Sequence, residues 1–246
     1  MQKAVIIFIF TFFLMVSCEK SSVGDCFKST GSVSIVERSI TGFHTVVLKD
    51  NVNLVLNKDN TNSLTIEAGS NLLSEIISEV NDSVLTIQNT NSCNWMRSYN
   101  TPITAYLTFA NLDTIQYQSI GDISSIDTIH TDNLMINVTE GAGEINFIVE
   151  AKTLYCNIHY GTADIKMRGN ANVCYVYSSS FGLINNLDLN ADFVYLNNRG
   201  SNDVYVKANK VLGVTIENIG NVFYEGNPYD ISLNQIGSGQ LIKLED

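Results

Sequence analysis

Proline and positive charge are both scarce in this sequence of 246 residues. The chain contains only 2 prolines, which excludes proline-rich linkers between domains. Its 14 Lys and Arg residues are outnumbered by 25 Asp and Glu residues, so the formal net charge is −11 at pH 7. Nucleic-acid binders need clustered cations to replace the counterions on phosphate, and we therefore expect no nucleic-acid partner. Charged residues make up 16% and hydrophobic residues 45%, which excludes a disordered chain.

Motifs of catalysis and of metal binding are also missing from the sequence. No Gly-x-Ser-x-Gly, His-Glu-x-x-His or glycine-rich phosphate loop occurs. The three histidines, His44, His130 and His159, share no ligand spacing, and there is no Cys-x-x-Cys pair. Asp164 and Asp203 fall near turns, but neither has a second carboxylate close by in the sequence. The sequence therefore predicts no metal, no cofactor and no catalytic residues.

Residues 1–17 have the pattern of a secretory signal peptide. Residues 4–16 form an apolar run of 13 residues, too short to span a bilayer, which needs about 20. The run ends at Ser17-Cys18, which resembles the bacterial lipobox, whose cysteine is lipidated and becomes the first mature residue. We therefore expect a lipid anchor at Cys18 in the bacterial envelope, with the outer membrane favoured, and a tether over residues 18–41. An ordinary cleaved signal with a coincidental cysteine is the alternative.

Four further cysteines remain: Cys26, Cys93, Cys156 and Cys174. An exported compartment permits disulfides, and four thiols allow three pairings among which the sequence cannot choose. Cys26 and Cys93 both lie in polar, loop-like stretches, which makes them one candidate pair. The alternative is that all four are free thiols or small apolar residues.

A pattern of about 20 residues recurs from Leu134 onward. Each cycle holds an alternating strand, a glycine-containing turn and a second alternating strand. The residues that open successive cycles are Leu134, Leu154, Val173, Val194, Leu212 and Ile231, separated by 20, 19, 21, 18 and 19 positions. This period is typical of a solenoid, in which stacked coils bury a continuous core. We therefore predict an all-β fold, a single-stranded right-handed parallel β-helix with regular coils over residues 111–246.

A β-sandwich of meandering hairpins is the competing architecture. Two-residue Asn-Gly and Asp-Gly turns, which hairpins favour, are missing from this half of the sequence. The nearly constant spacing of equivalent residues is not expected of a sandwich either. Both observations favour the β-helix.

The first half of the chain also reads as β, but less regularly. The stretches with strand-like composition are Thr45–Lys49, Val52–Asn57, Leu64–Ala68, Val84–Gln88 and Ile103–Phe109. One short helix is predicted over Asn71–Ser78, where apolar residues recur four positions apart and Asn71 could cap the first turn. We therefore expect an irregular N-terminal part over residues 42–110, which could cover the open end of the solenoid.

Several of these segments together resemble a known family. The segments are Gly42-Phe43-His44-Thr45-Val46, Val52–Leu56, Leu64–Glu67, Asn71-Leu72-Leu73 and Val84–Ile87. With the later glycine-containing repeats, they are similar to the head GIN domain of "putative auto-transporter adhesins", from residue 42 to the C-terminus. The resemblance implies a β-helical fold in an exported protein of Gram-negative bacteria. It carries over no catalytic residues.

Two outward-facing rows are predicted on the coils, because side chains alternate along a strand. The first holds Met135, Tyr155, Cys174 and Tyr195, whose apolar and aromatic character on an outer face indicates an interaction surface. In the alternative, the N-terminal half or the Asn89–Asn100 loop with Trp95 covers this row. The second row is polar and could form a ladder of stacked amides; it holds Asn137, Asn157, Val176, Asn197, Thr215 and Asn234.

These features favour a non-catalytic, adhesin-like binding scaffold in the cell envelope. Its partners would be the membrane, through the anchor at Cys18, and a protein, a glycan or a second copy of the chain. The alternative function is a carbohydrate-active enzyme of the polysaccharide lyase or hydrolase type, since parallel β-helices also host such enzymes. A structural envelope lipoprotein without a soluble ligand is a third interpretation.

Overall fold

The computed structural model describes residues 29–92 and 101–245. The predicted signal peptide, the tether up to residue 28, Cys18, Cys26, Cys93 and Trp95 lie outside these residues, so the expectations that rest on them stay predictions. Among the described residues there is no helix of the length and apolarity needed to cross a membrane.

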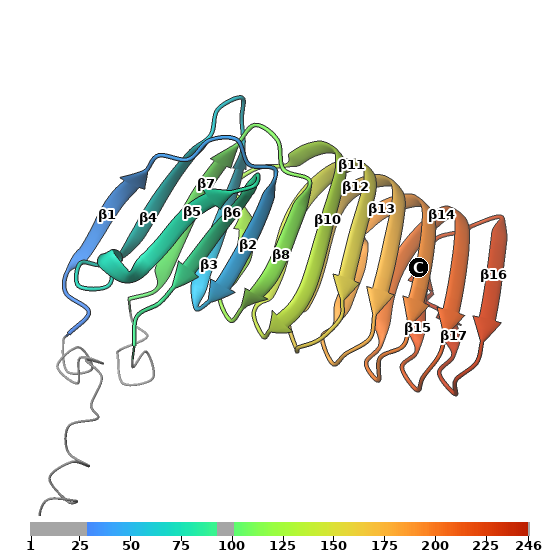
Figure 1. The fold of residues 1–246 in the computed structure, drawn as a ribbon. Coiled ribbons are helices and arrows are strands. Elements are labelled where there is room, and N and C mark those ends of the chain that lie inside the picture. Colours follow the sequence, from blue (N-terminus) through green and yellow to red (C-terminus); the bar gives the residue numbers. More distant parts are fainter. Residues whose placement is uncertain (1–28, 93–100, 246) are drawn as a thin grey trace, which may run out of the picture.

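Most of the chain is a solenoid of stacked coils, which confirms the predicted parallel β-helix (Figure 1). Five long strands dominate it: β10 (Ile129–Gly141), β11 (Glu144–Ile158), β12 (Asp164–Ser178), β13 (Ile184–Asn198) and β14 (Val204–Ile216). Each pairs in parallel with the next. Their buried residues alternate in two sets separated by a polar bend, so each long strand contributes two limbs. Shorter strands extend the stack at both ends: β8 (Thr114–Ser119) and β9 (Ile123–Ser125) on one side, β15 (Val222–Glu225), β16 (Asp230–Gln235) and β17 (Leu241–Lys243) on the other.

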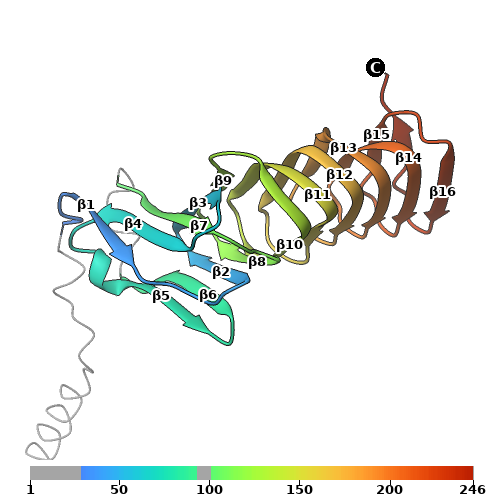
Figure 2. The same ribbon diagram turned by 90° about the horizontal axis from the view of Figure 1, so that it is seen from above.

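Parallel coils continue into the N-terminal half, further than the sequence pattern indicated. Strands β2 (Thr45–Asp50) and β3 (Val52–Lys58) stack in parallel on β8 and β9, and on their other side on β6 (Val84–Asn89) and β7 (Ile103–Phe109). Among the described strands, β1 (Val33–Arg38), β4 (Ser63–Gly69) and β5 (Ile76–Asn81) form only antiparallel pairs: β1 with β4, β4 also with β7, and β5 with β6. This N-terminal part lies at one end of the solenoid (Figure 2). Five predicted strands, those matching β2, β3, β4, β6 and β7, are confirmed.

The helix predicted over Asn71–Ser78 is wrong. Only Leu73–Glu75 is helical, as a single 3₁₀ turn, and β5 begins at Ile76. Strand β5 forms a hairpin with β6, and the connecting residues Asp82 and Ser83 adopt positive φ angles of 47° and 65°. Pairing with β6 buries Ile76, so tertiary contacts override a local pattern that fits a helix.

The register of the coils differs from the prediction by one residue in β12. Leu154 pairs with Cys174, and Cys174 pairs with Val194, so Cys174 takes the inward position assigned to Val173. Cys174 is 1% exposed. Its prediction as an outward residue of the interaction surface is therefore wrong, and the side chain beside it, Tyr175, points outward instead.

Aspartate and asparagine side chains connect the turns of neighbouring coils. Asp164 Oδ1 accepts a hydrogen bond from the backbone N–H of Leu183 at 2.8 Å. Asp203 Oδ1 accepts one from Asn221 at 2.8 Å, and Asn221 Oδ1 accepts one from Gln240 at 3.0 Å. Backbone N–H groups in turns need such partners, because the strands do not supply them.

Candidate binding surface

Three tyrosine rings stack on one another along the outer side of the second limb. Tyr155, Tyr175 and Tyr195 are paired in register across β11, β12 and β13. The ring centroids of Tyr155 and Tyr175 lie 4.9 Å apart with an 11° interplanar angle, and those of Tyr175 and Tyr195 lie 5.5 Å apart at 24°. We call these three residues the tyrosine ladder. Stacked aromatic pairs of this kind contribute about 0.5–1.5 kcal/mol each.

The tyrosine ladder is open to solvent. Tyr175 is 38% exposed and Tyr195 is 42% exposed, whereas Tyr155 is half-buried. The N-terminal half, proposed above as a cover, lies at the end of the solenoid and leaves these rings exposed (Figure 2). The other proposed cover, Trp95, lies outside the described residues.

Sequence reasoning missed Tyr175, although the sequence holds the signal for it. Three tyrosines stand at positions 155, 175 and 195, so their spacing is 20 in both steps. That spacing matches the number of residues per coil and would have assigned all three to one row. The pattern of apolar residues is less decisive here, because residues 173–177 (Val-Cys-Tyr-Val-Tyr) are apolar or aromatic without a break.

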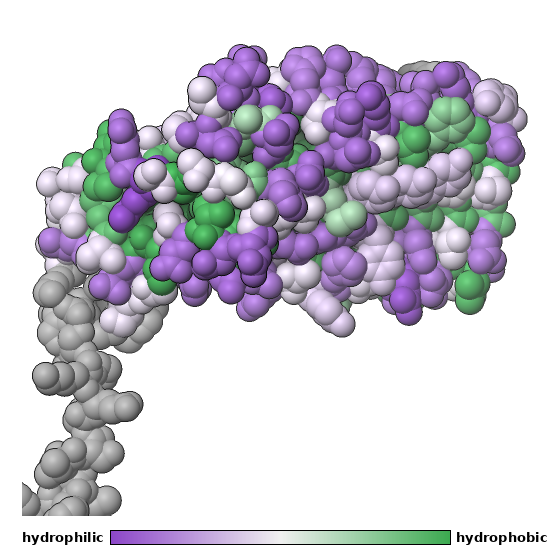
Figure 3. All heavy atoms as spheres, turned by 45° about the horizontal axis from the view of Figure 1, so that its top comes forward, coloured by the Kyte–Doolittle hydropathy of each residue, from purple (hydrophilic) through white to green (hydrophobic). Residues whose placement is uncertain are grey.

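The rows beside the tyrosine ladder differ in polarity. Half-buried apolar residues flank it on one side; they are Val173, Phe193 and Val211. On the other side Asn157 Nδ2 donates a hydrogen bond to Asn137 Oδ1 at 2.8 Å, which confirms one step of the predicted amide ladder. Tyr177, not Val176, occupies the next rung and interrupts it. On the face that Figure 3 shows, apolar and weakly polar side chains form bands along the solenoid, bordered by hydrophilic ones.

A second aromatic stack lies on the first limb. Tyr205 and Phe223, paired across β14 and β15, have ring centroids 4.8 Å apart with an interplanar angle of 9°. Both side chains are half-buried. This pair offers a comparison for the tyrosine ladder, because it has the same kind of stacking on another outer side of the coils.

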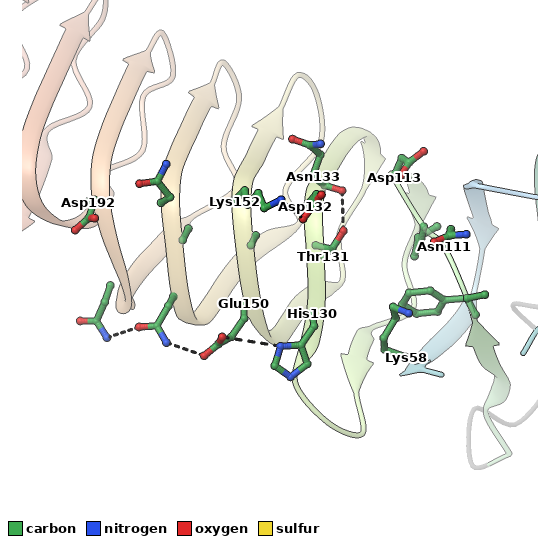
Figure 4. Close-up of a pocket in the computed structure, with 18 of the residues that line it drawn as sticks. Lys58, Asn111, Asp113, His130, Thr131, Asp132, Asn133, Glu150, Lys152 and Asp192 are labelled. Carbon is green, nitrogen blue, oxygen red and sulfur yellow. Dashed lines mark hydrogen bonds and ion pairs between the residues drawn. The ribbon is translucent and has the colours of Figure 1, made fainter. Parts of the chain in front are cut away.

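A polar groove of about 900 Å³ follows the bends of the coils (Figure 4). Side chains from successive coils are linked along it. Asn190 Nδ2 donates to Asn170 Oδ1 at 3.4 Å, Asn170 Nδ2 donates to Glu150 Oε1 at 3.1 Å, and His130 Nδ1 lies 3.9 Å from Glu150 Oε2. The groove is thus lined by amides and carboxylates that already bond to one another.

Two close ion pairs lie in or beside the groove. The Lys152 ammonium lies 2.8 Å from Asp132 Oδ1, and Lys210 Nζ lies 2.8 Å from Asp192 Oδ2. The hydrogen bond and charge of Asp192 raise the pKa of Lys210. Within residues 29–92 and 101–245, no three His, Cys, Asp or Glu side chains are placed to hold a metal ion.

The residues considered for catalysis are dispersed over the molecule. Asp164 and Asp203 serve as hydrogen-bond acceptors in separate turns. His44 Nδ1 lies 3.7 Å from Asp113 Oδ2, whereas the ring of His159 rests against Tyr177 with centroids 5.1 Å apart. The structure brings none of these groups together into one site.

The two described cysteines lie side by side in the core. Cys156 and Cys174 are both free and buried. A hydrogen bond to Cys156 and burial raise the pKa of the Cys174 thiol well above its usual range. Asn186 Nδ2 also lies 3.6 Å from Cys156 Sγ. The Cys174 thiol therefore stays protonated at physiological pH, and both cysteines pack as small core residues.

The chain matches a known protein family over most of its length. The family is described as "Putative auto-transporter adhesin, head GIN domain", and its model matches residues 42–228. None of the curated proteins matches the chain.

Solved structures with the same fold come from Bacteroides and Parabacteroides species. A "putative adhesin" from Bacteroides fragilis is 20% identical, with a TM-score of 0.75, and the match covers 87% of this chain and 97% of that one. A "putative lipid binding protein" from Parabacteroides distasonis is 18% identical, with a TM-score of 0.65 and coverages of 88% and 98%. A "putative adhesin" from Parabacteroides merdae is also 18% identical, with a TM-score of 0.62 and the same coverages. At these identities the similarity establishes the fold.

Proposed function

Because the chain belongs to the family of "putative auto-transporter adhesins" with a head GIN domain, we propose that it is a non-catalytic binding scaffold of the cell envelope. The tyrosine ladder is the contact surface in this proposal. Three rings held in register on a rigid sheet present aromatic area at little entropic cost, which suits both sugar rings and protein partners. The exposure of Tyr175 and Tyr195 is the observation that carries the proposal.

The proposal includes a lipid anchor at Cys18 in the outer membrane. Its support is the apolar run that ends at Ser17-Cys18 and the description of the family as adhesins. An anchor at the N-terminus would hold the solenoid by the end that carries β1. The ladder, which lies on the coils beyond the N-terminal part, would then be displaced from the membrane.

Several contacts favour binding over the alternative of a carbohydrate-active enzyme. Acid–base catalysis requires a carboxylate placed within hydrogen-bond reach of a substrate, usually with a second group beside it. Asp164 and Asp203 instead bond to turn amides, and Asp132 and Asp192 are paired with lysines. Incubating the protein with pectins and other glycans and measuring new reducing ends or unsaturated sugars tests the alternative directly.

The binding role is tested by removing two exposed rings of the ladder. Tyr175→Ser combined with Tyr195→Ser should weaken binding to immobilised glycans and envelope proteins by about tenfold or more. The melting temperature should fall by only a few degrees, because the variant loses two stacking contacts of about 0.5–1.5 kcal/mol each while both rings are already partly solvated. Light scattering on the same variant reports whether the ladder mediates self-association.

The matched control is Tyr205→Ser combined with Phe223→Ser, which removes the stacked pair on the first limb. It should leave binding unchanged. Equal loss of binding in both variants, or retained binding and self-association in the ladder variant, would contradict the proposal.

A further inference from the structure

The tyrosine ladder ends at a glycine. Tyr195 pairs with Gly213 of β14, and Gly213 pairs with Ser232 of β16. Tyr175 covers one face of the Tyr195 ring, so the other face points toward the coil that holds Gly213. A Cβ atom at position 213 would lie 3.0 Å from Tyr195 Cδ1, which places the edge of the ring directly beside the glycine. The fourth rung of the stack therefore carries no side chain of its own. One side of the Tyr195 ring leans toward it, and Ser232 Oγ would lie 3.4 Å from a Cβ placed there.

A hollow of about 580 Å³ runs along the outer side of the second limb from β11 to β16 and includes this position. Its lining combines the rings of the ladder with polar residues of the next two coils, among them Thr215, Ser232 and Asn234. These three side chains make no hydrogen bond within the described residues, so their donors and acceptors are available to a ligand. The hollow thus offers an aromatic face beside free hydroxyl and amide groups.

The hollow carries no charge. None of the residues that line it is Asp, Glu, Lys, Arg or His, although the chain as a whole has a net charge of −11. An anionic ligand would be repelled by the overall field. The same field would attract a cation, but no carboxylate in the hollow could pair with it. The lining therefore excludes an anionic occupant, and its uncharged hydroxyl and amide groups fit a neutral ligand best.

A sugar ring fits these three properties together. One face of a pyranose presents C–H groups that pack on the negative face of an aromatic ring, and its hydroxyls require hydrogen-bond partners around the rim. A purely aromatic occupant would stack on Tyr195 equally well but would leave Thr215, Ser232 and Asn234 without partners. An acyl chain would neither stack on Tyr195 nor form hydrogen bonds with these three side chains.

We propose that the hollow over Gly213 is a subsite for one neutral pyranose ring of a glycan, stacked on the free face of Tyr195. Its hydroxyls bond to Thr215, Ser232 and Asn234. This inference rests on the proposed function, since it names the ligand class and the position on the same surface. It assigns a role to Gly213: the absence of a side chain leaves room for the ligand.

The decisive variant is Gly213→Tyr, which supplies the missing ring from the protein itself. Gly213 does not have a positive φ, so a side chain is compatible with its backbone. The new ring would extend the stack, after a small shift of Tyr195, and fill the subsite. The melting temperature should therefore be retained or raised while sugar binding is lost.

The experiment measures calorimetric affinities of the full-length protein for maltohexaose, cellohexaose and mannohexaose, with oligogalacturonate as the charged comparison. At least one neutral hexasaccharide should bind, and Gly213→Tyr should weaken that binding by about tenfold or more. Asn185→Tyr is the matched control, because it adds a ring next to Tyr205 on the first limb. It should leave the affinity within about twofold.

Two outcomes would overturn the subsite. In one, no neutral hexasaccharide binds at concentrations of about 10 mM. In the other, Gly213→Tyr leaves the affinity unchanged. If the ladder variant still loses binding to envelope proteins in either case, the proposed function survives and only the sugar subsite fails. Preference for oligogalacturonate over the neutral sugars would likewise contradict a neutral ligand.

Discussion

The hydroxyl of Tyr117 accepts a hydrogen bond from the backbone N–H of Gly143 at 2.8 Å inside the solenoid. The same hydroxyl donates to the carbonyl oxygen of Gly121 at 2.7 Å, so one side chain satisfies the turns of two successive coils. Tyr117 is fully buried. A Cβ atom at position 143 would collide with the phenol oxygen, which explains why a glycine occupies that turn.

Tyr117→Phe should lower the free energy of unfolding by about 1–3 kcal/mol, because it leaves the partly buried Gly143 N–H and the buried Gly121 carbonyl without their partner. Urea denaturation followed by circular dichroism measures the change. Tyr205→Phe, which removes a hydroxyl from an outer side of the coils, is the control. An equal effect of the two substitutions would show that the bridge contributes nothing specific.

The stability of the fold should decrease at high pH through the same residue. Burial raises the pKa of Tyr117 to about 12, above the value of 10.0 for an unperturbed tyrosine. The unfolded chain therefore releases this proton first as the pH rises, and folding loses stability between pH about 10 and pH about 12. Denaturation midpoints measured across this range should fall more steeply for the wild type than for Tyr117→Phe. If the midpoints of the wild type and of Tyr117→Phe fell equally with pH, the raised pKa of Tyr117 would not be the cause.

Leu154→Asp should be severely destabilising. Leu154 is fully buried and pairs with Leu134 on one side and Cys174 on the other, so its replacement buries an unpaired charge between two coils. Thermal melting should show a large decrease or no folded protein. Leu154→Met, which keeps the volume and the apolar character, should cost less than about 1.5 kcal/mol. Wild-type melting of the aspartate variant would refute the observed register.

Cys156 and Cys174 should resist alkylation in the folded protein. Their thiols are buried, and the raised pKa of Cys174 keeps it protonated at neutral pH. Iodoacetamide labelling followed by peptide mass mapping distinguishes these two sites from the other cysteines. Modification should appear only in denaturant. Rapid labelling of either site under native conditions would mean that the coils open readily.

Cys18→Ala should abolish acylation and leave an unprocessed precursor, because the thiol of Cys18 is the proposed attachment point. Metabolic labelling with a fatty-acid analogue and the mass of the mature protein provide the measurement. Ser22→Ala, close by in the tether, is a control that should retain the lipid. A wild-type protein without any acyl chain would exclude the anchor.

Much of the fold could be predicted from the sequence because the coil is a repeated unit. Leu134, Leu154, Val194 and Leu212 were assigned to the inward row, and all four are buried. The predicted register is wrong at Val173 and Cys174, two adjacent residues that are both apolar. Alternation with period two cannot select between neighbouring positions when each could pack inside. The contacts among three stacked coils determine which of Val173 and Cys174 points inward. These contacts depend on the whole solenoid and not on the local sequence.

The candidate site depended on that same choice. Placing Cys174 outward breaks the row of tyrosines, whereas placing Tyr175 there creates the ladder. The vacancy after Tyr195 could not be inferred without it, although the glycine at 213 was visible in the sequence. The tyrosine ladder consists of residues 20 positions apart in the sequence, and they come into contact only through the register of the coils.

Strand β16 connects the binding surface to the dynamics of the solenoid. All six of its residues are exposed, including Ile231 at 44% and Leu233 at 45%, whose counterparts Leu212 and Val214 are buried. Among the described strands only β14 has a pairing register with it, so its amide protons should exchange with solvent earlier than those of the inner coils. A sugar held between Tyr195 and Ser232 would fasten this strand to the coils behind it. Binding of the sugar would then slow hydrogen exchange in β16, although Tyr195, on which the sugar stacks, lies two coils away.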